Sequence, residues 1–104
     1  MEQVAFLMRL KPGHEAEYRK RHDEIWPELH EALIKAGICD YSIFLEKETG
    51  NLFAVLRLAP DNTRQTLPTL PIMRKWWDYM APLMDVDSTN KPVERPLARV
   101  FHMD

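Results

Sequence analysis

Segments with a two-residue period alternate with helical segments along this chain, and their order restricts the folds open to it. Side chains alternate between two faces over Val4–Leu10, as they do in a half-buried strand. The segments Ile38–Glu46 and Leu52–Ala59 flank a glycine-containing loop of hairpin length, so they predict two antiparallel strands. Residues 85–96 are polar and contain prolines, which indicates a loop, and the alternation over Leu97–His102 predicts a fourth strand.

Prolines interrupt both helical segments. Residues 14–36 have helical composition but contain Pro27, which lacks a backbone donor and clashes with the preceding turn. We therefore expect one helix up to about Ile25 and a second helix that begins at Pro27. Residues 63–84 also indicate a helix in two pieces, because prolines at positions 68 and 71 prevent a continuous one.

The order strand, helix, strand, strand, helix, strand is that of the ferredoxin-like, split βαβ fold. We therefore expect one α+β domain over residues 1–104, with an antiparallel sheet and helices on one of its faces. The strands carry many large apolar side chains, so the other face also needs cover. In so short a chain a second copy packed sheet against sheet gives that cover, which predicts a homodimer.

Charge and cysteine content exclude several classes of protein. Fourteen basic and sixteen acidic residues give a net charge of −2, which favours neither nucleic acid nor anionic lipid. The longest unbroken apolar run, Val4–Met8, is too short to span a bilayer, and no export signal is visible. The single cysteine, Cys39, cannot form an internal disulfide and is expected to be a small core residue. These features predict a cytoplasmic protein with no membrane or nucleic-acid partner.

The sequence offers no evident metal or nucleotide site. His14, His22 and His30 are eight residues apart, which separates neighbours by about 12 Å along a helix. No HExxH pair, glycine-rich dinucleotide motif or P-loop occurs. We therefore expect neither a metal nor a cofactor. The basic run at residues 19–21 is interleaved with acidic residues and indicates a solvated helix face.

Tyr18 and His22 are the first candidates for chemistry. They are four residues apart, so their side chains lie on one face of the first helix. An imidazole gives or takes a proton near neutral pH, and a neighbouring phenol donates or accepts a hydrogen bond. The pair suits proton transfer between oxygens of a neutral polar ligand. The spacing equally fits a core tyrosine beside a solvated or capping histidine.

Aromatic residues elsewhere offer walls for such a ligand. Trp76 and Trp77 are adjacent and point about 100° apart on a helix. One is expected in the core, and the other lines a cavity, an interface or the solvent, where an indole suits the C–H face of a sugar; both could instead be packing residues. Tyr41 either points into a pocket between sheet and helices or is a core tyrosine, and Trp26 is expected to fill the space left by Pro27.

Several runs of the sequence resemble the L-rhamnose mutarotase family, and the resemblance covers essentially the whole chain. The elements HxxIWPEL, from His22 onward, and WWxYM, from Trp76 onward, are specific to it. The matching runs are Tyr18–Leu29 (YRKRHDEIWPEL), Asp40–Leu45 (DYSIFL), Lys75–Met80 (KWWDYM) and Val100–Asp104 (VFHMD).

The resemblance implies a dimeric α+β barrel of ferredoxin-like protomers. It also implies interconversion of the α and β anomers of L-rhamnose without cofactor or metal. The acid of the family corresponds to His22, and its sugar-contacting residues correspond to Tyr18, Tyr41, Trp76 and Trp77. We expect His22 to protonate the ring oxygen. The base could be Tyr18, a water, or His22 itself acting through a shuttle. An uncharged sugar should need aromatic walls and neutral polar groups, with no arginine clamp.

Two other functions fit the same fold. One is a cofactor-free monooxygenase of the dimeric α+β barrel type, which would consume oxygen with a quinol substrate. The other is a non-catalytic sugar-binding dimer, which would bind a ligand without accelerating anomer exchange.

Overall fold

The computed structural model describes residues 1–104, and its strands form one antiparallel sheet. The strand order is β2-β3-β1-β4, which confirms the ferredoxin-like α+β fold predicted from the sequence. The strands are β1 (Glu2–Arg9), β2 (Ile38–Glu46), β3 (Asn51–Leu58) and β4 (Arg95–Leu97).

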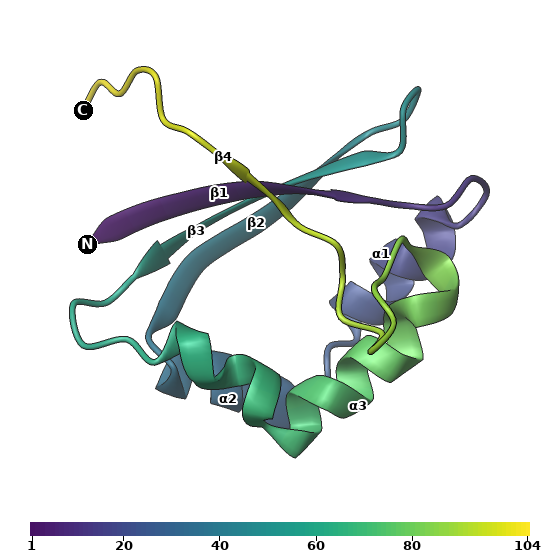
Figure 1. Ribbon diagram of the computed structural model, residues 1–104, viewed down its shortest axis with the longest axis horizontal. Helices are drawn as coiled ribbons and strands as arrows, with labels where there is room; N and C mark the ends of the chain where they lie inside the picture. The colour runs from purple at the N-terminus through teal and green to yellow at the C-terminus, as the bar shows by residue number, and fades with distance from the viewer.

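All of the helices lie on one face of this sheet (Figure 1). The core fills the space between the sheet and the helices. Each strand turns every second side chain toward the helices, and the side chains buried there are apolar. No helix has the length and apolar character needed to cross a membrane. The helical elements are α1 (Glu15–Asp23), α2 (Pro27–Lys35), η1 (Arg64–Thr69), α3 (Pro71–Met80) and η2 (Ala81–Leu83).

The break between α1 and α2 occurs where Pro27 predicts it. Trp26 is extended, with φ −60° and ψ 129°, and Pro27 is the first residue of α2. A residue that precedes proline is driven out of the helical region, and proline itself suits the first helical turn. Trp26 is half-buried and packs against the core, as expected of a residue at this break.

A β-bulge in β2 changes the face on which its side chains lie. Between Cys39 and Ser42 the register shifts, so Asp40 and Tyr41 together oppose Leu56 of β3. Asp40 takes the left-handed conformation, with φ 48°, which Asp tolerates better than most residues. Tyr41 therefore shares the helix face with Leu56. Cys39 is exposed, so the prediction that it is a core residue is wrong.

The last strand is shorter than predicted and lies earlier in the chain. β4 pairs with Ala5–Leu7 of β1 only over Arg95–Leu97, so the predicted strand at 97–102 is wrong beyond its first residue. Beyond Leu97 the contact continues through a side chain, since Arg99 Nη2 donates to Gln3 Oε1 at 2.7 Å. Alternation of residue types did not show that the backbone ladder ends there.

The face of the sheet opposite the helices carries apolar side chains. Leu7 pairs with Phe53, which pairs in turn with Phe44, so the three lie in one row across three strands. Phe44 is 62% exposed and Phe53 39%. The chain after β4 is also apolar and exposed, with Val100 at 95%, and Figure 1 shows it continuing without returning to the helices.

Candidate active site

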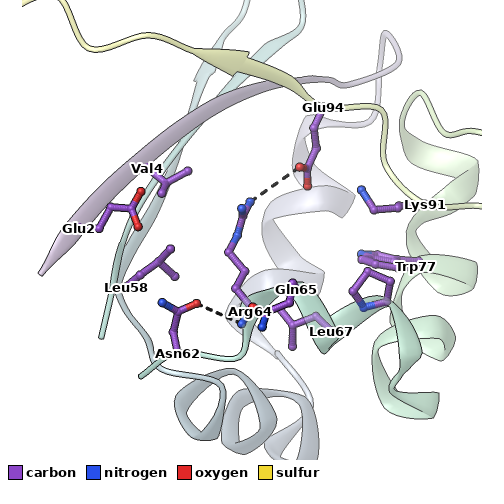
Figure 2. Close-up of a pocket in the computed structure, with 11 residues that line it drawn as sticks. Glu2, Val4, Leu58, Asn62, Arg64, Gln65, Leu67, Trp77, Lys91 and Glu94 are labelled. Carbon is purple, nitrogen blue, oxygen red and sulfur yellow. Dashed lines mark hydrogen bonds and ion pairs between the residues drawn. The ribbon is translucent and has the colours of Figure 1, made fainter. Parts of the chain in front are cut away.

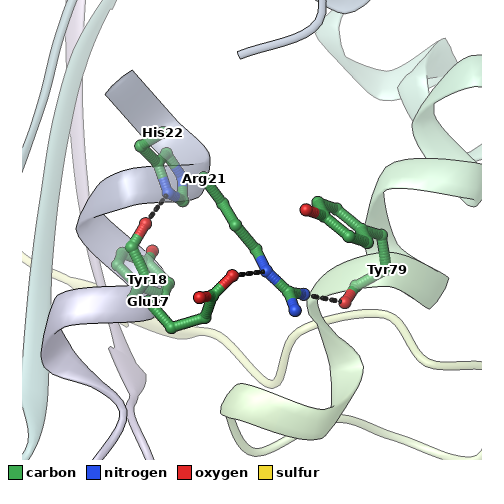
Figure 3. A network of polar contacts seen from close by, with 5 residues as sticks. All are labelled: Glu17, Tyr18, Arg21, His22 and Tyr79. Carbon is green, nitrogen blue, oxygen red and sulfur yellow. Dashed lines mark hydrogen bonds and ion pairs between the residues drawn. The ribbon is translucent and has the colours of Figure 1, made fainter. Parts of the chain in front are cut away.

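Tyr18 and His22 face each other on α1, as their spacing predicts. Their ring centroids are 4.4 Å apart, and His22 Nδ1 lies 3.0 Å from the backbone oxygen of Tyr18 (Figure 3). A carbonyl oxygen only accepts hydrogen bonds, so Nδ1 carries the proton and donates it. Nε2 is therefore the ring nitrogen left to act on a ligand.

Burial sets the protonation states of this pair. It lowers the pKa of His22, and the hydrogen bond to Tyr18 and the charge of Asp23 only partly oppose the effect. Burial likewise raises the pKa of Tyr18, to which the neighbouring Tyr41 contributes. At neutral pH the site thus holds a mainly neutral imidazole beside a protonated phenol.

Trp76 borders the imidazole and belongs to a larger aromatic cluster. Its ring meets that of His22 edge to face, with centroids 5.4 Å apart and planes at 87°. Trp26 packs against Trp76 in the same way at 5.0 Å and stacks on Tyr79 at 5.3 Å. Such arrangements are favourable for aromatic rings and hold the indole in one orientation.

Trp77 points toward a different region. Its ring lies 5.2 Å from the guanidinium carbon of Arg74 and 5.6 Å from Lys91 Nζ, and it lines a cavity of about 410 Å³. Trp76 is 6% and Trp77 9% exposed. Both indoles are therefore core residues, as the packing alternative allowed, and the expectation that only one would be buried is wrong; Trp77 also lines the cavity.

The bulge in β2 places Tyr41 on the helix side, where the charges of Arg64 and Glu94 act on its hydroxyl. Burial, assisted by Glu94 and opposed by Arg64, raises the pKa of Tyr41 to about 12. The residue as a whole is 39% exposed. The charge of an ionised Tyr41 also raises the pKa of Tyr18.

Charged side chains line the cavity beside Trp77. Figure 2 shows Arg64 crossing it toward Glu94, with Glu2 and Lys91 also at its wall. These charged side chains differ from the neutral polar groups expected around an uncharged sugar, and neither His22 nor Tyr18 lines this cavity. Arg64 and Glu94 are thirty residues apart in a helical segment and a loop, and no local pattern connects them.

A second charged network fastens α1 to α3. Arg21 Nε donates to Glu17 Oε2 at 2.6 Å, and its Nη1 donates to the backbone oxygen of Tyr79. The guanidinium carbon also lies 3.9 Å from the centroid of the Tyr79 ring (Figure 3). Only 17% of the Arg21 side chain is exposed, so the solvated helix face predicted for residues 19–21 is wrong at this position.

The donor groups do not converge on a metal site. No three His, Cys, Asp or Glu side chains come close enough to hold an ion. His22, Tyr18 and Tyr41 are instead proton donors and acceptors, and the rings of Tyr18 and Trp76 border the imidazole. This arrangement can bind a small neutral ligand and move protons between its oxygens.

Known proteins resemble this chain over its full length. The sequence profile of the L-rhamnose mutarotase family matches residues 3–103. An L-rhamnose mutarotase of Rhizobium johnstonii is 53% identical over 103 residues, which are 99% of this chain and 97% of that one. One of Bacteroides thetaiotaomicron is 53% identical over all of both chains. The crystal structure of L-rhamnose mutarotase from Formosa agariphila, 42% identical, superposes over all of both chains with a TM-score of 0.93.

Proposed function

The chain belongs to the L-rhamnose mutarotase family and is an isomerase that interconverts the α and β anomers of L-rhamnose, and we propose that it does so through His22. The observation that carries this assignment is the bond from His22 Nδ1 to the Tyr18 carbonyl. It fixes the tautomer, which leaves Nε2 as the ring nitrogen that can accept a proton from a ligand. The full-length matches favour neither of the other two functions, an oxygenase or a binding protein.

In the proposed reaction His22 carries one proton between two oxygens of the same carbon. Neutral Nε2 takes the proton from the hydroxyl on C1, and the C1–O5 bond breaks as the C1 carbonyl forms. The imidazolium then gives the proton to O5, which is the acid role predicted from the sequence. Rotation about C1–C2 and the reverse steps close the ring as either anomer. No proton or electron is gained or lost, and no cofactor is needed.

Burial suits His22 to both halves of this shuttle. Because burial lowers its pKa, the resting imidazole is mainly neutral and ready to accept, and the imidazolium is a stronger acid toward O5. We propose that Tyr18 and Tyr41 hold the sugar oxygens as neutral phenols, since both pKa values are raised. Trp76 and Trp77 would provide the apolar walls.

Saturation-transfer NMR on L-rhamnose tests the role of His22. This measurement reports exchange between anomers at equilibrium, where no net reaction is visible. We expect His22→Ala to lower the exchange rate by about 10²- to 10⁴-fold, with the circular dichroism spectrum unchanged. Unchanged exchange in a folded His22→Ala protein would remove His22 from the mechanism.

We also propose that the whole chain, residues 1–104, acts as one domain in a homodimer. The row Leu7, Phe53 and Phe44 lies on the sheet face that carries no helix, and a second copy packed there would remove it from water. A free thiol at Cys39 is compatible with the reducing cytoplasm, where we place the protein.

A further inference from the structure

Two charged side chains in the cavity beside Trp77 are not used by the proton shuttle. Arg64 Nη2 and Glu94 Oε2 are 3.8 Å apart, and their side chains are 31% and 29% exposed. That distance is too long for a hydrogen bond. Neither the guanidinium of Arg64 nor the carboxylate of Glu94 forms a hydrogen bond within the chain. The one side chain that Arg64 contacts by a hydrogen bond is Asn62, whose Oδ1 accepts from the Arg64 backbone N–H at 3.2 Å.

The surroundings hold the guanidinium in place while leaving its donors free. The backbone bond to Asn62 fixes the base of Arg64 at the start of η1. Its guanidinium carbon lies 5.4 Å from the centroid of the buried Phe6 ring, a contact that orients a flat cation. Figure 2 shows the side chain extended across the cavity toward Glu94.

This chemistry matches a polyhydroxylated, uncharged ligand. A guanidinium offers donors in a fixed fork and a carboxylate offers two acceptors, so neighbouring hydroxyls can bond to both. Since the two charges nearly cancel, the cavity does not select an ion of either sign. Its volume of about 410 Å³ lies within the range of small-molecule pockets.

The position of the pair relates it to the catalytic histidine. Arg64 and Glu94 line the same cavity as Trp77, and Trp76, which precedes Trp77 on α3, contacts His22 edge to face. The two adjacent indoles therefore connect the cavity that holds the pair with the imidazole. A sugar whose C1 meets His22 would extend its C3 and C4 hydroxyls in this direction.

We propose that Arg64 and Glu94 bind the ring hydroxyls of the sugar far from C1 and so determine which hexose the enzyme accepts. This inference rests on the proposed function, because it takes the place of C1 from the shuttle. It assigns binding to both residues and no part in proton transfer.

The experiment compares enzyme variants with sugars that lack one hydroxyl. Anomer exchange is measured by NMR for L-rhamnose and its 3-deoxy and 4-deoxy analogues, with the wild type, Glu94→Gln and Arg64→Lys. We expect each variant to raise KM for L-rhamnose about tenfold, with kcat within about threefold of the wild type. In the wild type, removal of the bound hydroxyl should raise KM by a similar factor, and in the variants that penalty should disappear.

A matched control separates this effect from loss of charge. Glu31→Gln makes the same change on the exposed face of α2 and should leave KM and every deoxy penalty unchanged. Unchanged KM in both variants, penalties that persist in them, or a fall in kcat alone would overturn the proposal. Absence of exchange in the wild type would instead overturn the proposed function.

Discussion

At the scale of single residues, one backbone carbonyl determines what His22 can do. Because Nδ1 is committed to the Tyr18 oxygen, the proposed shuttle must use the same nitrogen, Nε2, to accept and to return the proton. Sequence spacing predicts that the two side chains meet, but it does not predict this bond or the burial that lowers the pKa of His22. Both depend on packing against α3.

The pH dependence of kcat follows from the direction of that shift. The shuttle starts from neutral His22, and burial moves its pKa below the usual value of about 6.5. We expect kcat to fall as the pH drops through this lowered pKa and to stay level from neutral into mildly alkaline solution. Tyr41, with a pKa of about 12, remains protonated there.

NMR exchange rates from pH 4 to 9, less the rate without protein, give this profile. A catalysed rate that grows on acidification would mean that the imidazolium begins the reaction.

At the scale of elements, α1 carries Tyr18 and His22, and α3 carries Trp76 and Trp77, so the relative position of the two helices matters for the proposed site. Arg21 joins them through Glu17 and the Tyr79 carbonyl. We expect Arg21→Met to lower the free energy of unfolding by about 1–3 kcal/mol, because charged hydrogen bonds are lost, and to lower kcat/KM as the two helices separate.

Arg19→Met on the same helix is the matched control. The Arg19 side chain is 86% exposed and its contact with Asp23 is 3.9 Å long, so the change should be within about 0.5 kcal/mol of the wild type. Urea denaturation measures the free energy of unfolding of both variants. Equal losses of stability would show that Arg21 does not fasten α1 to α3.

Local signals predicted most elements, and long-range pairing accounts for the differences. Pro27 alone predicts the start of α2, the period of two predicts β1 and β2, and an apolar run after a hairpin-length loop predicts β3. The bulge at Asp40–Tyr41 and the end of β4 at Leu97 depend on which residues of neighbouring strands are available. The Arg64–Glu94 pair likewise forms only in the tertiary structure, so the sequence around either residue could not predict it.

At the scale of the whole molecule, the apolar row on the open sheet face should control assembly. Phe53 lies at its centre, between Leu7 and Phe44. We expect Phe53→Lys to produce monomers in equilibrium sedimentation, because a dimer would bury the new charge without a partner. Ile34→Lys adds the same charge at a residue that is 59% exposed on α2 and should leave the dimer intact. A wild-type chain that sediments as a monomer at micromolar concentration would contradict the proposed dimer.

The one-sided placement of the helices also has a kinetic consequence. The cavity that we propose for the sugar is lined by residues of the sheet and of the helical layer, so subunits joined through their strands would hold their two cavities back to back. Each cavity would fill and empty on its own outer side, and neither would have to wait for the subunits to separate. Such a pair behaves as two independent catalysts, with hyperbolic saturation and one bound sugar per chain.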